Sequence, residues 1–162
     1  MMHNKKYSVV AIGNAMLDLV CKVPEQFLKE EGISKGAMNL VSMERSNNIL
    51  KIVRPIKETA GGSAANTIST LAKLGLKTGY IGKIADDPKG KVFKKDLIDS
   101  SIYYNTEFLD ISNTEATGKC IVLITPDKER TMNTYLGATE FLTEIDIDEE
   151  LIAQSEWLYL EG

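Results

Sequence analysis

The segment ETAGGSAANTISTLAKLG, residues Glu58–Gly75, guides the interpretation of the whole chain. Two adjacent glycines, Gly61 and Gly62, precede a stretch whose apolar residues recur at helical spacing and which ends at a glycine. Glycine accepts a positive φ and has no Cβ, so another group can come close to the backbone at these two positions. The N-terminus of the following helix offers unpaired N–H groups and the positive end of the helix dipole.

Two interpretations of the glycine pair stay open on the residues alone. In the first, hydroxyl groups or an anion of a ligand lie against Gly61 and Gly62, the small Ser63 leaves room, and the Asn66 amide forms hydrogen bonds with that ligand. In the second, the glycines only form a tight turn before a helix that packs closely on a sheet. The sequence contains neither a GxxxxGK[ST] phosphate loop nor a GxGxxG dinucleotide fingerprint, so neither nucleotide motif explains the pair.

The surrounding sequence alternates between short β-branched runs and amphipathic stretches, which predicts an α/β domain with parallel strands. We expect the following helices: Pro24–Gly32, a helix capped by Ser42, Ser63–Leu74 with Gly75 as its stop, a helix capped by Asp87, and Asp146–Glu156. We expect strands at Tyr7–Asn14, Leu17–Val23, Ala37–Val41, Lys77–Ala85 and Trp157–Gly162, and a hairpin with a Pro-Asp turn within residues 117–136. The strands near 17–23, 37–41 and 117–136 are expected to form a small separate sheet.

Length, charge and cysteine content exclude several classes of protein. The 162 residues suit one domain, and the net charge of −4 argues against a general nucleic-acid binder. No run of about 18 apolar residues occurs, so we expect no membrane span. Cys21, Cys120 and the single histidine, His3, have no metal-ligand spacing, so no metal site is expected. Two isolated cysteines without an export signal indicate a reducing, cytoplasmic location.

Four segments, taken in chain order, resemble the N-terminal half of the ribokinase-like (PfkB-type) sugar and nucleoside kinases. They are VVAIGNAMLDLV, GGSAANTISTLAKLG, GYIGKIADDPKGKVFKKDL and TGKCIVLITPDKERTMNTYLGA. Together they cover nearly the whole chain, and the last is most similar to adenosine-kinase-like members. The resemblance implies a Rossmann-type α/β sandwich in which residues 1–162 form the N-terminal part of one domain. The small separate sheet would then be a lid over the substrate.

The resemblance also implies an activity, namely transfer of the γ-phosphoryl group of ATP, with Mg²⁺, to a hydroxyl of a sugar or nucleoside. Asn14 and Asp18 resemble the polar pair that grips the sugar, because a carboxylate can accept hydrogen bonds from two neighbouring hydroxyls. The residues that resemble the sugar-contacting turn and helix start are Gly61, Gly62, Ser63 and Asn66. Arg130 matches a lid-strand arginine that holds phosphate or closes the lid.

The chain departs from the family pattern in two places. Ribokinases proper tend to have a lysine after the glycine pair, whereas this chain has Ser63, which favours a nucleoside or a sugar other than ribose. The second family signature, a Gly-Ala-Gly-Asp turn that carries the catalytic aspartate, is absent from these residues. We therefore expect no catalytic residue here, and we expect the ATP site and the general base in a C-terminal half. The alternatives are a non-catalytic sugar- or nucleoside-binding module and one half of a split enzyme. The partners to expect are a separate C-terminal half or a second copy bound through the lid.

Several candidate residues also have an ordinary structural interpretation. Asp18 could cap the end of a strand, and Asn14 could be a turn residue. Asp86 and Asp87 look like a metal-binding pair, but an Asp-Pro step is a good helix start, and we favour the cap. Arg130 is equally well explained as a solvated charge on the hairpin. Cys21 and Cys120 are expected to be apolar fillers of lid strands.

Overall fold

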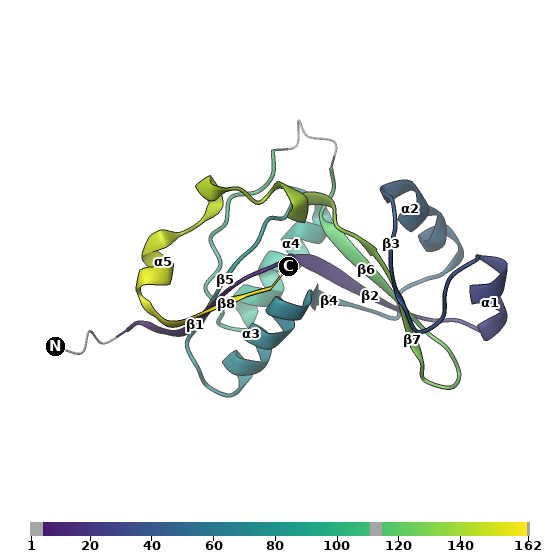
Figure 1. Cartoon of the computed structure of the whole chain (residues 1–162), viewed down its shortest axis with the longest axis horizontal. Helices are drawn as coiled ribbons and strands as arrows, with labels where there is room; N and C mark the ends of the chain where they lie inside the picture. Colours follow the sequence, from purple (N-terminus) through teal and green to yellow (C-terminus); the bar gives the residue numbers. More distant parts are fainter. Residues whose placement is uncertain (1–4, 111–114, 162) are drawn as a thin grey trace.

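The computed structural model describes residues 5–110 and 115–161, and it arranges them around two β-sheets (Figure 1). The strands are β1 (Tyr7–Ile12), β2 (Met16–Lys22), β3 (Met38–Leu40), β4 (Lys57–Gly61), β5 (Thr78–Ile81), β6 (Gly118–Ile124), β7 (Arg130–Tyr135) and β8 (Ser155–Leu160). The helices are α1 (Glu25–Glu30), α2 (Met43–Ile52), α3 (Ser63–Lys73), α4 (Pro88–Asp99) and α5 (Glu149–Ala153), with 3₁₀ turns η1 (Gly137–Phe141) and η2 (Glu144–Asp146).

The smaller sheet is parallel and has the order β5-β1-β8. Helices cover both of its faces: residues of β1 pack with Ile68 of α3 on one side and with Leu151 of α5 on the other. A parallel sheet needs such cover because both of its faces are apolar. The helix–sheet–helix layering confirms the predicted α/β class.

The larger sheet has five strands in the order β3-β7-β6-β2-β4. β2 runs parallel to β6, and β3 runs parallel to β7, whereas the β6–β7 hairpin and the β2–β4 pair are antiparallel. All three stretches predicted for a small separate sheet contribute strands to it. Helices α1 and α2 pack on one face, where Phe27 and Ile49 join Leu17, Leu19 and Ile121 in the main core.

The sequence analysis missed one strand of this sheet, β4. We predicted no strand directly before the glycine pair, but Lys57–Gly61 pairs with β2 over five residues. This segment, KETAG, has no run of β-branched or aromatic residues, so its own propensity does not indicate a strand. Its pairing comes from the edge of β2, which is a tertiary contact that the local sequence does not encode.

Other boundaries differ by a few residues from the predictions. The strand expected at Lys77–Ala85 ends at Ile81 because Gly82 leaves the sheet, where its N–H donates to Thr106 Oγ1. The last helix is shorter than Asp146–Glu156: Asp148 caps it and β8 already begins at Ser155. The final predicted strand residue, Gly162, lies outside the described residues.

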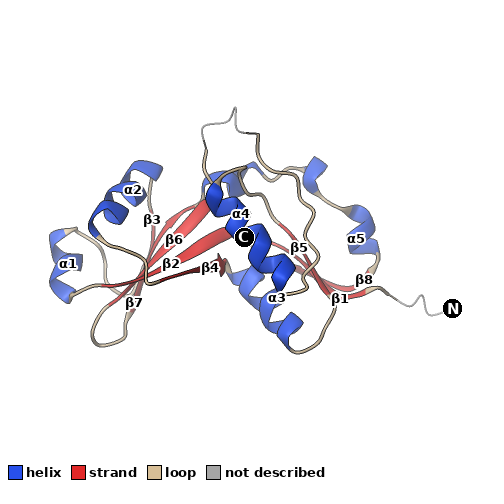
Figure 2. Cartoon of the chain, turned by 180° about the vertical axis from the view of Figure 1, so that it is seen from behind, coloured by secondary structure: helices blue, strands red, loops and turns tan. Residues whose placement is uncertain are grey.

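The predicted N-cap at Ser42 and the predicted stop at Gly75 are confirmed. Ser42 Oγ accepts a hydrogen bond from the Arg45 N–H at 3.1 Å, and Gly75 ends α3 with a φ of +89°. Viewed from behind, α3 and α4 flank the end of β4 (Figure 2). None of the helices in the described part of the chain is long and apolar enough to cross a membrane.

Candidate functional site

The candidate residues gather where the two sheets meet. The carboxyl end of β1 leads through Gly13 and Asn14 into β2, and β4 ends at the glycine pair that starts α3. The register places Met16 of β2 opposite Gly61 of β4 and Asp18 opposite Thr59, two residue pairs further along, so Met16 and Asp18 lie on the same face of the sheet. Ligands of parallel α/β sheets bind at this kind of edge, outside the carboxyl ends of the strands.

The carboxylate of Asp18 fills the space that a side chain at Gly61 would occupy. A Cβ built on Gly61 would lie 2.2 Å from Asp18 Cγ, which is far inside van der Waals contact. The Asn66 side chain, from the first turns of α3, forms a hydrogen bond with the same carboxylate. The structure therefore brings Asp18, Gly61 and Asn66 together, although they come from three different elements.

Gly62 is held just as closely. It is the N-cap of α3 with a φ of +92°, and a Cβ there would lie 2.2 Å from the carbonyl oxygen of Asn14. Because the N-cap residue Gly62 has no side chain, it cannot accept a hydrogen bond from the first turn of α3. The N–H groups of that turn, beginning at Ser63, are therefore not capped by a side chain at this edge. Contacts within the chain therefore leave no room for a side chain at either position. These contacts favour the interpretation of the pair as a site of close packing, and binding of a ligand at the glycines stays a prediction.

Burial raises the pKa of Asp18 above its ordinary value, while the positive charge of Arg130 and the hydrogen bond from Asn66 act in the opposite direction. Arg130 is the first residue of β7 and is exposed, and only its positive charge is shown to act on Asp18. The structure therefore places the predicted arginine within electrostatic range of the predicted carboxylate.

We expect Asp18→Asn to stabilise the chain at pH 7. Because the folded-state pKa lies above the unfolded value, the stability that this group contributes is present at low pH and is lost as the pH rises through the folded-state pKa. Removing the ionised carboxylate should raise Tm, at about 2–4 °C for each 1 kcal/mol gained in a chain of this size. The gain should vanish when thermal unfolding is repeated at a pH below the ordinary carboxyl range, and an equal gain at both pH values would contradict the assignment.

The sheet face beside Asp18 is apolar. Met16, Cys120 and Val122 form a buried cluster there, with Met132 and Leu136 packed against it. Asp18 of β2, Cys120 of β6 and Thr134 of β7 lie in one row of the sheet, so Thr134 is two strands, or about 10 Å, from Asp18. The prediction that Cys21 and Cys120 are apolar fillers is confirmed, since both are buried in apolar clusters.

This row leads into a cavity of about 420 Å³ at the end of β7. Its lining combines apolar and acidic side chains, namely Leu40, Met43, Leu136, Glu115 and Glu140. A ligand held at Asp18 and extending about 10 Å across the strands would reach it.

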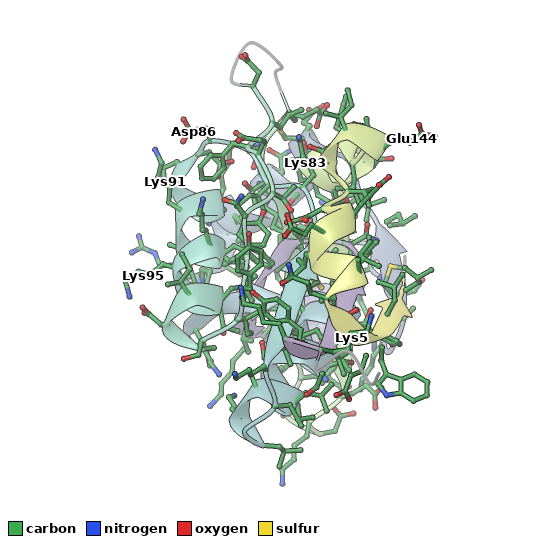
Figure 3. The ribbon with its side chains drawn as sticks, turned by 90° about the vertical axis from the view of Figure 1, so that its left-hand side faces the viewer. Lys5, Lys83, Asp86, Lys91, Lys95 and Glu144 are labelled. Atoms are coloured by element: carbon green, nitrogen blue, oxygen red, sulfur yellow. The ribbon has the colours of Figure 1, made fainter. Side chains whose placement is uncertain are left out.

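The aspartate pair is a helix start, as favoured from the sequence. Asp87 accepts hydrogen bonds from the N–H groups of Gly90 at 2.7 Å and Thr117 at 2.8 Å. Asp86 forms an exposed ion pair with Lys91 at 2.9 Å, and both side chains lie at the N-terminal end of α4 (Figure 3). Within residues 5–110 and 115–161, no group of three or more histidine, cysteine or acidic side chains is placed to hold a metal ion.

The sequence analysis did not select Glu161, which follows β8 at the same edge. Hydrogen bonds from Tyr159 and Ser63 hold the pKa of this carboxyl below its ordinary value. The Glu161 N–H donates to the carbonyl of Ile12, which fixes the residue beside the end of β1. The buried hydroxyl of Tyr80 also lies near Glu161 and has no hydrogen-bond partner in the described part of the chain. The available signal was an acidic residue at the carboxyl end of the predicted strand Trp157–Gly162.

Comparison with known protein families shows which family this chain belongs to. The profile of the pfkB family carbohydrate kinases matches residues 6–162. The chain belongs to the pfkB family. Its α/β fold is accordingly the ribokinase-like one, as the sequence resemblance implied.

Two solved kinase structures superpose on nearly the whole chain. The crystal structure of adenosine kinase from Sinorhizobium meliloti matches with a TM-score of 0.90 and 40% identity, over 97% of this chain and 47% of that one. A probable sugar kinase from Rhizobium etli matches with a TM-score of 0.90 and 34% identity, over 98% of this chain and 47% of that one. The predicted similarity to adenosine-kinase-like members is confirmed.

Among curated proteins, the chain is similar to 5-dehydro-2-deoxygluconokinases. The Bacillus licheniformis protein is 27% identical over 98% of this chain and 42% of its own length. The Listeria monocytogenes protein is 34% identical over 71% of this chain and 38% of its own length. The chain thus spans less than half the length of these relatives.

Proposed function

We propose that the chain is the substrate-binding half of an ATP-dependent nucleoside or sugar kinase. The observation that carries the proposal is the convergence of Asp18, Gly61 and Asn66 at the sheet edge of a pfkB-family chain. The Asp18 carboxylate would accept hydrogen bonds from two neighbouring hydroxyls of the substrate. The α3 N-terminus beyond Gly62 and Ser63, together with Asn14, would complete the polar side of the pocket.

The apolar face beside Asp18 favours a nucleoside over a bare sugar. The hydroxyls of a bare sugar would satisfy Asp18 and Asn66 but would leave the apolar side chains of the cavity, Leu40, Met43 and Leu136, without a matching surface. A nucleobase has two apolar faces and polar edges, so it fits the row of side chains from Asp18 toward the cavity at Leu40. The similarity to an adenosine kinase supports this choice.

A sugar acid is the second candidate substrate. The positive charge of Arg130 acts on the site from β7, and a carboxylate on the substrate would complement it. Similarity to the 5-dehydro-2-deoxygluconokinases supports this alternative. A molecule of this class would bind at Asp18 and Asn66 in the same way and would differ in its contact with the lid.

We assign no site for ATP or Mg²⁺ to the described residues of this chain. The acidic groups near the site have other partners, and no phosphate-binding Gly-Ala-Gly-Asp turn occurs in the sequence. When bound, ATP and Mg²⁺ would supply the phosphoryl group and neutralise its charge, and we assign them to a second half of the protein. This chain would bind the substrate, orient its hydroxyl and cover it with the five-stranded sheet as a lid. Without a second half, it would be a nucleoside-binding module.

Asp18→Ala and Asn66→Ala should weaken adenosine binding without unfolding the chain. Neither side chain belongs to an apolar cluster, and each lost hydrogen bond to a hydroxyl should cost roughly 1–3 kcal/mol, about 5- to 150-fold in Kd. Calorimetry with adenosine, ribose and 5-dehydro-2-deoxygluconate measures this on the reassembled protein, that is, this chain combined with a C-terminal half of a pfkB-family kinase. Thr70→Ala, one helical turn beyond Asn66, is the matched control and should leave Kd unchanged. Unchanged affinity in both site variants would remove them from the pocket.

A further inference from the structure

The carboxylate of Asp96 on α4 contacts the backbone directly before the glycine pair. Asp96 Oδ2 accepts a hydrogen bond from the N–H of Ala60, and the two atoms are 2.8 Å apart. β4 lies at the edge of the five-stranded sheet and pairs only with β2. Asp96 therefore satisfies a donor on the outer edge of this strand, where the sheet offers no partner.

β4 has few other anchors. Its side chains from Lys57 to Ala60 are exposed or half-buried, and only Gly61 is buried. Ala60 is the one apolar side chain of β4, and it is only partly buried against the main core, so the strand is held mainly by its backbone hydrogen bonds and by what packs on its outer edge. An ionised acceptor forms a stronger hydrogen bond with an N–H group than a neutral one does, so the contact with Asp96 is a substantial part of that anchoring.

The helix that presents Asp96 is itself well fixed. Phe93 and Leu97, the residue next to Asp96, are buried in the main core. Asp87 caps the N-terminus of α4. The Asp96 carboxylate is thus a fixed point to which the end of β4 is attached.

We propose that Asp96 is a positioning residue of the substrate site. Its hydrogen bond to the N–H of Ala60 keeps the neighbouring Gly61 in contact with the Asp18 carboxylate. It thereby fixes the position of that carboxylate relative to Asn66. The importance of this placement for a substrate rests on the proposed function, whereas the coupling of Asp96 to Gly61 and Asp18 does not.

A second contact between α4 and β4 provides the control. Lys89 Nζ lies 3.9 Å from a carboxylate oxygen of Glu58, and both side chains are partly exposed. Ion pairs of this kind contribute little to stability. Glu58→Gln therefore removes a contact between the same two elements without touching Ala60.

The test compares Asp96→Leu, Asp96→Asn and Glu58→Gln in the chain of 162 residues, with no ligand present. In Asp96→Leu, the Ala60 amide should exchange with solvent about tenfold faster, while the amides of Ile121 and Leu123 in β6 keep their rates. The carboxyl titration of Asp18, followed by NMR, should shift to lower pH because Gly61 no longer covers that carboxylate. Asp96→Asn keeps an acceptor oxygen and should restore most of the protection, and Glu58→Gln should match the wild type.

Two results would overturn the proposal: an unchanged Ala60 exchange rate in Asp96→Leu, or faster exchange spread evenly over β6 and β7. If Asp18 titrates at the same pH in Asp96→Leu as in the wild type, Asp96 anchors β4 but does not position the Asp18 carboxylate. That result would also overturn the proposal. A separate measurement, adenosine binding to the reassembled protein, should show a Kd at least about fivefold weaker in Asp96→Leu. If the wild type binds no adenosine, the proposed function fails, and the two ligand-free measurements still decide the role of Asp96.

Discussion

Residues 1–162, incubated with ATP, Mg²⁺ and adenosine, should consume no ATP above background. Phosphoryl transfer depends on positioning the phosphates, on neutralising their charge and on a group that orients the attacking hydroxyl. The acids near the site are already engaged: Asp87 caps α4, Asp86 pairs with Lys91, and Asp18 lies against Gly61. The sequence has no Gly-Ala-Gly-Asp turn to replace them.

ATP consumption should appear when a C-terminal half is added, for example that of the Sinorhizobium meliloti adenosine kinase. We expect this half to pair with the edge of the parallel sheet at β8, where Trp157 is 72% exposed and Leu160 is 64% exposed. An unpaired apolar edge of this kind accepts another strand and otherwise invites aggregation. Trp157 is the single tryptophan of the chain, so its fluorescence should shift to shorter wavelength on pairing.

The control is the same C-terminal half with the aspartate of its Gly-Ala-Gly-Asp turn changed to asparagine. This variant should still shift the Trp157 emission but should give no turnover, which separates assembly from chemistry. Turnover by residues 1–162 alone would contradict the assignment of the base and the ATP site to a second half. Binding of adenosine without turnover under any mixing condition would favour the nucleoside-binding module.

Local sequence was sufficient for elements whose signals lie within a few residues of one another. Ser42, Asp87 and Gly75 act through the hydrogen bonds and backbone angles of their own helix ends, so their types and positions predicted the caps. The hairpin of β6 and β7 was predicted in the same way, from its Pro-Asp turn and its flanking strands. β4 could not be predicted, because its strand conformation depends on pairing with β2, about 40 residues earlier.

The candidate site was predicted in part by the family resemblance and not by local pattern. The structure brings together the predicted residues Asp18, Gly61 and Asn66, but it shows that the carboxylate itself takes up the space at Gly61. Contacts such as Asp96 to Ala60, 36 positions apart, connect elements whose packing no short segment encodes. Glu161 was overlooked for the same reason, since its partner Ser63 lies on α3.

Gly62→Val should be far more damaging than Gly75→Ala. Both glycines have a positive φ, +92° at Gly62 and +89° at Gly75, so any side chain is strained at either position. They differ in what a Cβ would contact: at Gly75 nothing lies within 4 Å, whereas at Gly62 the carbonyl oxygen of Asn14 lies at 2.2 Å. Backbone strain alone should cost about 1 kcal/mol in Gly75→Ala, and adenosine affinity should stay unchanged.

At Gly62 the clash adds to the strain and cannot be relieved by a side-chain rotation, because the contacted atom belongs to the backbone of the β1–β2 connection. Either that connection moves, which displaces Asn14 and the nearby Asp18, or α3 moves, which displaces Asn66. Both outcomes separate the residues proposed to grip the substrate, so we expect adenosine binding to be lost even where thermal unfolding shows a folded chain. Gly62→Ala is the milder variant for that comparison. Wild-type adenosine affinity in Gly62→Ala would mean that the substrate does not depend on the alignment of Asn14, Asp18 and Asn66.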